Sequence, residues 1–181
     1  MIVDSRLHCY TSTINILDIS IGCETVQSSH RTTPKKTIWS KYSTAPHIRT
    51  LCSSNQWWTV QLKDIFQIIQ VRVYTPAVNR SDIASYFFCN AVNPIISRSS
   101  INSRIFPTLT ISTGSIHSNT WRAVASLLIA YELDSTQMIS KKYETDNLTA
   151  LNIYSNRVRV NSSSEYGFHL KKVEVIGNGM T

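Results

Sequence analysis

Apolar and polar residues alternate along several short stretches of the chain, the pattern of β-strands with one buried face. Trp58, Val60 and Leu62 alternate with Thr59 and Gln61. The same period of two, with polar residues in between, recurs in four further pairs or triplets of apolar residues: Ile69, Val71 and Val73; Leu109 and Ile111; Val158 and Val160; Val173 and Val175. Segments rich in Ser, Thr, Asn, Asp and Pro separate these stretches, and no long segment shows a 3.6-residue stripe. The pattern predicts an all-β protein with a jelly-roll β-sandwich.

Two segments depart from this alternation. The longest apolar run, residues 124–131, predicts a strand or a short helix, because a membrane-spanning helix needs about 20 apolar residues. Residues 82–102, with Tyr86-Phe87-Phe88-Cys89 near the start, resemble neither a strand nor a helix. We expect a long loop or insertion there, where function or variability commonly lies.

The length of 181 residues and the 42% hydrophobic content predict one domain with a real core, extending from residue 12 to residue 178. The first residues, Met1–Arg6, do not combine a basic start with an apolar stretch. A secretory signal is therefore not visible, and two alternatives stay open: an intracellular protein, or a coding sequence whose start is missing.

A net charge of +7 raises the question of an anionic partner. Lys and Arg are scattered along the chain, and the local pairs at 35–36, 141–142 and 171–172 are short. We interpret the charge as a solvated basic surface, with an acidic partner such as a sulfated glycan or an anionic lipid as the alternative. No basic stripe indicates nucleic-acid binding.

The sequence shows no motif of a known reaction. The five glycines form no phosphate-binding cluster, the five histidines have no metal-binding spacing, and no serine lies in a G-x-S-x-G turn. A triad built from distant residues stays open, because its geometry is set in space. We expect no catalytic residues and no enzyme activity.

Three separated stretches carry a resemblance to a known family. They are Glu24-Thr25-Val26-Gln27-Ser28-Ser29, then Asn55-Gln56-Trp57-Trp58-Thr59-Val60-Gln61-Leu62, and finally Leu170-Lys171-Lys172-Val173-Glu174-Val175-Ile176-Gly177. In this order they resemble the fucolectin family of the galactose-binding, discoidin-like superfamily. The resemblance implies a galactose-binding domain-like sandwich that binds glycans without catalysis. We interpret Trp57 and Trp58 as packing residues of core and edge, because aromatic side chains bury large areas.

The resemblance also implies a sugar site. Asn79-Arg80-Ser81-Asp82 resembles the Asn-Arg-Gly-Asp of the family's fucose pocket, and Arg104 stands for its second basic residue. Guanidinium forks donate paired hydrogen bonds to vicinal sugar hydroxyls, and a carboxylate orients the fork. The family's upstream His has its nearest counterpart in His47. The long segment between Asp82 and Arg104 implies a remodelled rim.

The resemblance does not extend to the family's calcium site or to its closing-strand cysteine. The calcium loop corresponds to Ile38-Trp39-Ser40-Lys41-Tyr42, which has no carboxylate, and Lys172 takes the place of a Glu. Calcium prefers a cage of oxygens, so we expect no metal and no cofactor. Lys171 replaces the cysteine that pairs, in the family, with the counterpart of Cys52. Four widely spaced cysteines remain, Cys9, Cys23, Cys52 and Cys89, and Cys52 can pair with Cys23 or Cys89.

Two functions follow from the resemblance. The leading prediction is an extracellular lectin-like module for fucose-containing or related glycans, with glycans or glycoproteins as partners and avidity from oligomers or multivalent targets. The alternative is an adhesion or interaction domain that has lost the sugar and calcium sites. It would meet a protein or an anionic membrane surface through the loop that holds Tyr86, Phe87 and Phe88.

Overall fold

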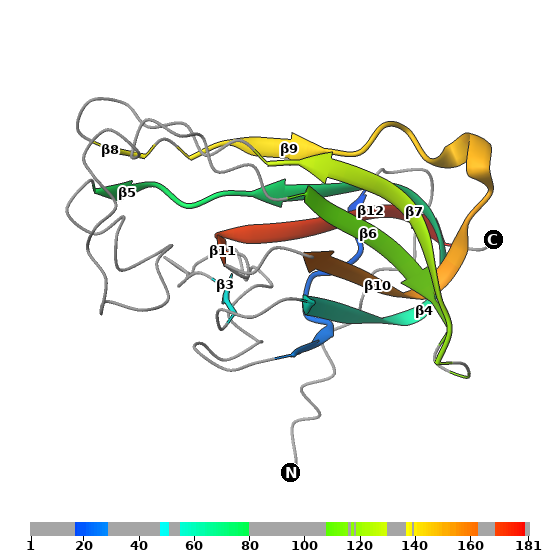
Figure 1. Cartoon of the computed structure of the whole chain (residues 1–181). Coiled ribbons are helices and arrows are strands. Elements are labelled where there is room, and N and C mark those ends of the chain that lie inside the picture. Colours follow the sequence, from blue (N-terminus) through cyan, green and yellow to red (C-terminus); the bar gives the residue numbers. More distant parts are fainter. Residues whose placement is uncertain are drawn as a thin grey trace, which may run out of the picture.

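The fold is organised around one long bent strand, β4 (Gln56–Tyr74). The structure is a computed structural model, and it describes residues 17–28, 48–50, 55–79, 108–115, 117, 119–129, 137–138, 140–162 and 169–179. The other described elements are the strands β1 (Leu17–Asp18), β2 (Glu24–Gln27), β3 (Ile48–Arg49), β5 (Val78–Asn79), β6 (Thr108–Gly114), β7 (Trp121–Leu128), β8 (Gln137–Met138), β9 (Lys142–Glu144), β10 (Tyr154–Ser162), β11 (His169–Leu170) and β12 (Lys172–Gly179), and the 3₁₀ helix η3 (Thr149–Leu151). Figure 1 shows their arrangement.

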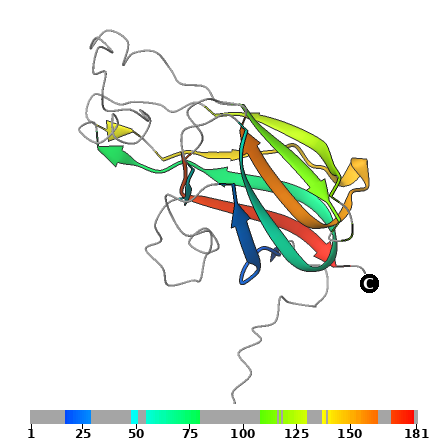
Figure 2. The same cartoon turned by 60° about the horizontal axis from the view of Figure 1, so that its bottom comes forward.

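β4 belongs to two layers because it bends near its middle. Its first part pairs antiparallel with β2 and β10, and β10 continues the layer through β6 to β7. Its second part pairs with β9 and β12, and β12 pairs with β1. Figures 1 and 2 show β6, β7 and β10 crossing over the layer that contains β9 and β12. A strand that changes sheets at a bend is a recognised way to close a sandwich.

The bend itself is a large bulge. The pairing of β10 with β4 runs from Arg157 opposite Gln61 directly to Ser155 opposite Phe66. The intervening β4 residues include exposed Lys63, Asp64 and Ile65. The Asp64 carboxylate accepts a hydrogen bond of 2.7 Å from the backbone N–H of Ile65, which supports the turn locally.

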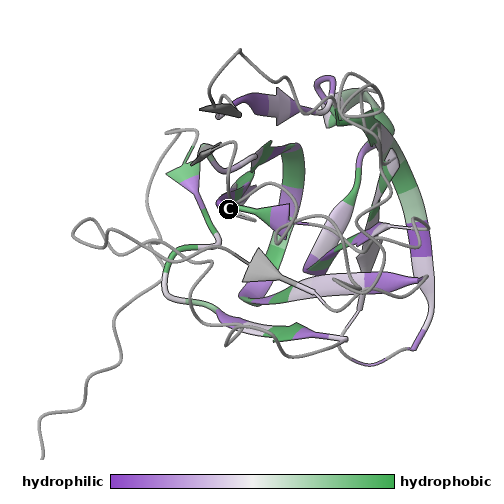
Figure 3. Cartoon of the chain, turned by 60° about the vertical axis from the view of Figure 1, so that its left-hand side comes forward, coloured by the Kyte–Doolittle hydropathy of each residue, from purple (hydrophilic) through white to green (hydrophobic). Residues whose placement is uncertain are grey.

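The inward faces of both layers meet in one hydrophobic core, as the alternation predicts. Trp58, Val60 and Leu62 come from the first part of β4, and Val71 and Val73 from its second part. They pack with the apolar residues of the other strands: Leu109, Ile111, Val158, Val160, Val173 and Val175. Figure 3 shows hydrophobic and hydrophilic residues alternating along strands of the sandwich. Trp58 is completely buried, which confirms its predicted packing role.

One core position differs from the prediction. The sequence pattern places Ile69 on the buried face with Val71 and Val73, yet Ile68 is fully buried and Ile69 is only partly buried. The register of β12 against β4 shifts between Ile176 and Gly177, opposite this point. Such a bulge reverses which side of the sheet the following residues face, so strict alternation fails here.

Residues 124–128 of the long apolar run lie in strand β7, so for this part the strand is confirmed over the short helix. β7 is the last strand in the described order of its layer, and Leu128 at the end of β7 is 62% exposed. No helix in the described ranges is long and apolar enough to cross a membrane. The predicted loop at residues 82–102 lies outside the described residues.

Candidate functional site

The four residues predicted to form the sugar site, His47, Arg80, Asp82 and Arg104, lie outside the described residues. Each of the four lies within a few positions, along the sequence, of a described strand. His47 directly precedes β3, Arg80 and Asp82 follow β5, and Arg104 lies shortly before β6. The positions of β3, β5 and β6 therefore show from which end of the sandwich the chain continues toward the predicted site residues.

β3, β5 and the start of β6 lie at one end of the sandwich. In the first layer, the β10 residue Ser162 is opposite both Gln56 at the start of β4 and Leu109 at the start of β6. In the second layer, Tyr74 at the end of β4 is opposite Lys172, and the adjacent pairs β3–β11 and β5–β8 continue from there. Figure 1 shows β3, β5, β8 and β11 together on the left of the molecule. We call this region the loop end.

A second arrangement lies on the outer face of the first layer, where Arg159 of β10 is placed between two tryptophans. Its guanidinium carbon is 4.5 Å from the ring centroid of Trp57 and 3.8 Å from that of Trp121. Arg157 lies over the same Trp121 ring at 4.7 Å. These distances are within cation–π range. We call Trp57, Trp121, Arg157 and Arg159 the tryptophan–arginine platform.

The sheet register explains how four residues distant in sequence meet. Arg157 is opposite Gly114 of β6, and Gly114 is opposite Trp121 of β7. A Cβ added to Gly114 would lie 3.1 Å from Cε3 of Trp121, so the indole lies across the glycine toward β10. Trp57 is opposite Asn161, two positions beyond Arg159 on the same face. The missing side chain of Gly114 is thus what admits Trp121 to the platform.

Buried Ser155 fixes the backbone below the platform. Its hydroxyl lies 2.6 Å from the carbonyl oxygen of Gly114 and 2.7 Å from that of Arg157, and it accepts hydrogen bonds from the N–H groups of the same two residues at 3.2 and 3.1 Å. It sits where the β4–β10 register shifts. The side chain therefore connects β6 and β10 at the position where regular strand pairing is interrupted.

The platform has an uncompensated positive charge. Arg159 donates to the Thr59 hydroxyl at 3.1 Å, and Arg157 donates to the Ser115 carbonyl at 3.4 Å. Within the described part of the chain, neither guanidinium forms an ion pair with a carboxylate. Burial, and secondarily the charge of Arg157, lowers the pKa of Arg159. The two arginines thus repel each other without a counterion from this part of the protein.

Sequence reasoning did not identify the platform. Arg157 and Arg159 alternate with Val158 and Val160, so the sequence pattern predicts that the two arginines lie on the polar side of the strand. The pattern does not predict their contact with Trp121, because that contact depends on the strand order β10–β6–β7. Trp57 was interpreted as a packing residue, and it does pack, although against Arg159 on the outer face and not in the core.

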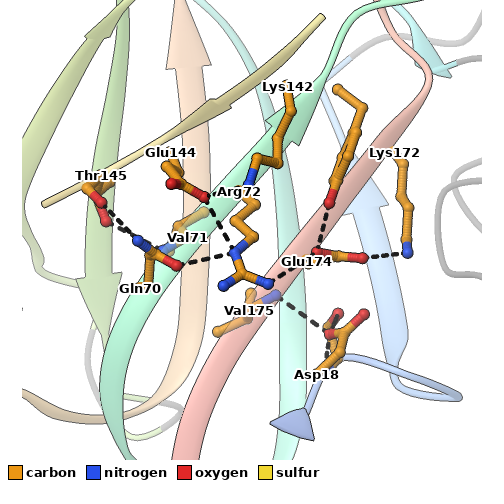
Figure 4. Close-up of polar contacts among 12 residues, drawn as sticks. Asp18, Gln70, Val71, Arg72, Lys142, Glu144, Thr145, Lys172, Glu174 and Val175 are labelled. Atoms are coloured by element: carbon orange, nitrogen blue, oxygen red, sulfur yellow. Dashed lines mark hydrogen bonds and ion pairs between the residues drawn. The ribbon is translucent and has the colours of Figure 1, made fainter. Parts of the chain in front are cut away.

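The outer face of the second layer carries a different polar cluster (Figure 4). Arg72 of β4 lies between two carboxylates, with Nε 3.3 Å from Glu144 and Nη1 3.7 Å from Glu174. Lys142 pairs with Glu144 at 2.8 Å, and Lys172 pairs with Glu174. The strand order β9–β4–β12 puts these acidic and basic residues opposite each other.

Glu174 is the best-protected carboxylate of this cluster, with 12% of its side chain exposed. Burial alone would raise its pKa, but hydrogen bonds from Lys172 and Tyr74, together with the charges of Lys172 and Arg72, outweigh burial and lower it. Tyr74 donates its 2.8 Å bond to Glu174, and burial and this bond raise the pKa of Tyr74 to about 12. With its charges mutually paired, the cluster is arranged for stability and not for holding a charged ligand.

Asp18 connects β1 to this layer. Its Oδ1 accepts hydrogen bonds from the backbone N–H groups of Val175 at 3.2 Å and Ser20 at 3.1 Å. Burial raises the pKa of Asp18 despite these bonds. Among the residues that the structure describes, no group of three or more His, Cys, Asp or Glu side chains could hold a metal ion.

Comparison with known proteins bears on the fold. No family model matches the sequence, and no curated protein sequence matches it. Chitosan-binding module 1 from a chitosanase/glucanase of Paenibacillus sp. IK-5 aligns over 90% of this chain and 100% of its own, at 14% identity and a TM-score of 0.56. The lectin domain of lectinolysin, solved with Lewis B antigen, aligns over 92% of this chain and 100% of its own, at 15% identity and a TM-score of 0.53.

The chain has the galactose-binding-like sandwich fold. A third structure, SpGH29, agrees: 91% of this chain aligns with 28% of that longer chain, at 8% identity and a TM-score of 0.54. Identities this low concern the fold alone. The predicted fold class is therefore confirmed, whereas membership of the fucolectin family stays a prediction.

Proposed function

We propose that this chain is a non-enzymatic carbohydrate-binding module that takes fucose-containing or related glycans at the loop end of its sandwich. Arg80 and Arg104 would donate paired hydrogen bonds to sugar hydroxyls, Asp82 would orient the forks, and His47 would add a polar contact. The comparable sandwiches include a chitosan-binding module and a lectin domain solved with Lewis B antigen.

The observation that carries the proposal is the convergence of the flanking strands. β3, β5 and the start of β6, which are close to His47, Arg80 and Arg104 in sequence, all lie at the loop end. The described part of the chain thus stops at Asn79 and resumes at Thr108 at the same end of the sandwich, which supports placing the residues between them there. Loops that a rigid sandwich holds together at one end are a common location for binding residues.

The test is a glycan array probed with wild-type protein and the variants Arg80→Ala and Arg104→Ala. Each loss of a charged sugar contact should weaken binding about ten- to hundredfold, the equivalent of about 1–3 kcal/mol. Arg122→Ala is the matched control, because Arg122 is exposed at the opposite end of the first layer, next to the turn between β6 and β7. Equal fucosylated-glycan signals from wild type and Arg80→Ala would remove the site assignment.

Two further measurements test for a calcium requirement and for an anionic membrane partner. We expect a chelator to leave glycan binding unchanged, because Lys172 occupies the family's Glu position and its ammonium group is paired with Glu174. Salt-dependent binding to anionic liposomes without sugar competition would instead support the interaction-domain alternative. A single shallow site binds weakly, so we expect stronger signals from multivalent glycans or from a homo-oligomer.

We infer an extracellular location and at least one disulfide. Of the four cysteines, Cys23 is described: it is buried, and its sulfur lies 3.4 Å from the carbonyl oxygen of Ile19. Peptide mapping without reduction distinguishes a bridge between Cys52 and Cys23 from one between Cys52 and Cys89. Four unmodified thiols after purification in air would contradict this inference.

A further inference from the structure

The half-buried tryptophan–arginine platform is a feature that the loop-end site does not use. It extends along β10 from Arg157, near the bend of β4, to Trp57, opposite Asn161. Four residues of strand correspond to about 13 Å, which exceeds one sugar ring. The platform is therefore shaped for an extended ligand that lies along the strand.

The positive charges on this face favour an anionic ligand. Arg157 and Arg159 have no carboxylate partner in the described ranges, and they repel each other. Among the described strand residues, the acidic residue nearest to Arg157 in the sheet register is Glu24, which is opposite Gln61 and so lies one strand further away. An anionic group placed over the two guanidinium groups would relieve their repulsion and accept their hydrogen bonds.

The contrast with the second layer strengthens this argument. There, Arg72 also lies on an outer sheet face, but it is flanked by Glu144 and Glu174 at 3.3 and 3.7 Å. Within the described ranges, the fold thus neutralises Arg72 internally and leaves Arg157 and Arg159 without a counterion.

The neighbours of the platform favour a sugar chain over a nucleic acid. Neutral side chains with hydroxyl or amide groups line the same face next to the arginines, namely Gln61, Thr110 and Asn161. They match the many hydroxyls of a carbohydrate. Nucleic-acid bases need an open aromatic face for stacking, whereas Arg159 lies over both indoles.

We infer that the outer face of the first layer is a second binding site, at which Trp57, Trp121, Arg157 and Arg159 hold an acidic polysaccharide that carries uronate or sulfate groups. The guanidinium groups bind the anionic groups of the polysaccharide. The indoles flank the polysaccharide and hold the guanidinium groups in place, and the neutral side chains contact its hydroxyls. This site is separate from the loop-end site in both residues and ligand charge.

The test measures binding of polygalacturonate, dextran sulfate, neutral dextran and a 20-nucleotide oligo-dT by titration calorimetry at physiological salt. Wild-type protein should bind at least one of the two acidic polysaccharides and not neutral dextran. Arg157→Ala and Arg159→Ala should each weaken that binding about tenfold or more. The two polysaccharides distinguish uronate from sulfate as the bound group.

Matched variants separate the platform from general surface charge. Arg122→Ala removes the same charge from an exposed side chain that follows Trp121 in sequence but is not part of the platform. It should change affinity less than twofold. Arg159→Lys keeps the charge but loses the planar fork, and should weaken binding several-fold. If Arg159→Ala fails to fold by circular dichroism, Arg157→Ala and Arg159→Lys decide the question.

Three results would overturn the inference: equal binding by wild type and the Arg157→Ala and Arg159→Ala variants, an equal loss in Arg122→Ala, or tighter binding of oligo-dT than of either polysaccharide. The loop-end proposal is measured independently. Arg80→Ala should leave acidic-polysaccharide binding unchanged, and Arg157→Ala should leave fucosylated-glycan binding unchanged.

Discussion

The indole of Trp121 lies across Gly114, which has no side chain to block it. An alanine at this position would place its Cβ 3.0 Å from the Thr120 carbonyl oxygen and 3.1 Å from Cε3 of Trp121. Contacts this close require the indole or the backbone to move. The two residues are opposite each other on β6 and β7, so the sheet register and not sequence proximity determines their contact.

Gly114→Ala should therefore displace Trp121 from the platform. We expect a loss of stability of about 1–3 kcal/mol from overpacking, together with weaker acidic-polysaccharide binding. Urea denaturation and tryptophan fluorescence measure the two effects. Unchanged fluorescence and unchanged binding would show that the indole does not need the empty space at this position.

Ser155→Ala should destabilise the fold by about 1–3 kcal/mol. It removes a buried hydroxyl that accepts from the N–H groups of Gly114 and Arg157, and the new methyl group leaves both without this partner. Urea denaturation measures the loss. Ser126→Ala, at an exposed position of β7, is the control and should change stability by less than about 0.5 kcal/mol. Similar losses in both variants would contradict the connecting role of Ser155.

Glu174→Gln should lower stability at neutral pH by about 1–2 kcal/mol, because it removes the charge that pairs with Lys172 and Arg72. The folded-state pKa of Glu174 is lowered, so its contribution is complete above the ordinary glutamate pKa of about 4.3 and is lost as the pH falls through the lower folded-state value. Wild type and variant should therefore converge in acid.

Denaturation curves between pH 7 and pH 2 measure this convergence. Glu24→Gln, at an exposed position of β2, serves as a control that removes the same charge without breaking an ion pair of the described residues. A difference between wild type and Glu174→Gln that stays constant down to pH 2 would contradict the prediction.

Tyr74 should ionise later than the other tyrosines as the pH rises. Its folded-state pKa is about 12, above the ordinary value of 10.0, because burial and the hydrogen bond to Glu174 favour the neutral phenol. The stability that this gives is complete below pH 10 and is lost as the pH rises through about 12. Tyrosinate absorbance of wild type minus Tyr74→Phe should show a midpoint near 12. A midpoint at the ordinary value would remove the proposed protection.

The sequence by itself determined the fold class and much of the core. Alternation of residues such as Val158 and Val160 with Arg157 and Arg159 reports which side of a strand is buried, because successive side chains point to opposite faces. That rule needs no tertiary information, and it placed Trp58 in the core. It failed at Ile69, where a bulge changes the side on which residues lie, and a bulge depends on the partner strand.

Only the tertiary structure decided which exposed residues meet. Arg159 and Trp121 are brought together by the strand order β10–β6–β7, and Arg72 and Glu174 by the pairing of β4 with β12. Strand order across a sheet is set by the packing of the whole core, and sequence spacing carries no record of it. The sequence therefore supplied the tryptophans and arginines, and the sheet made a platform of them because it placed their strands side by side.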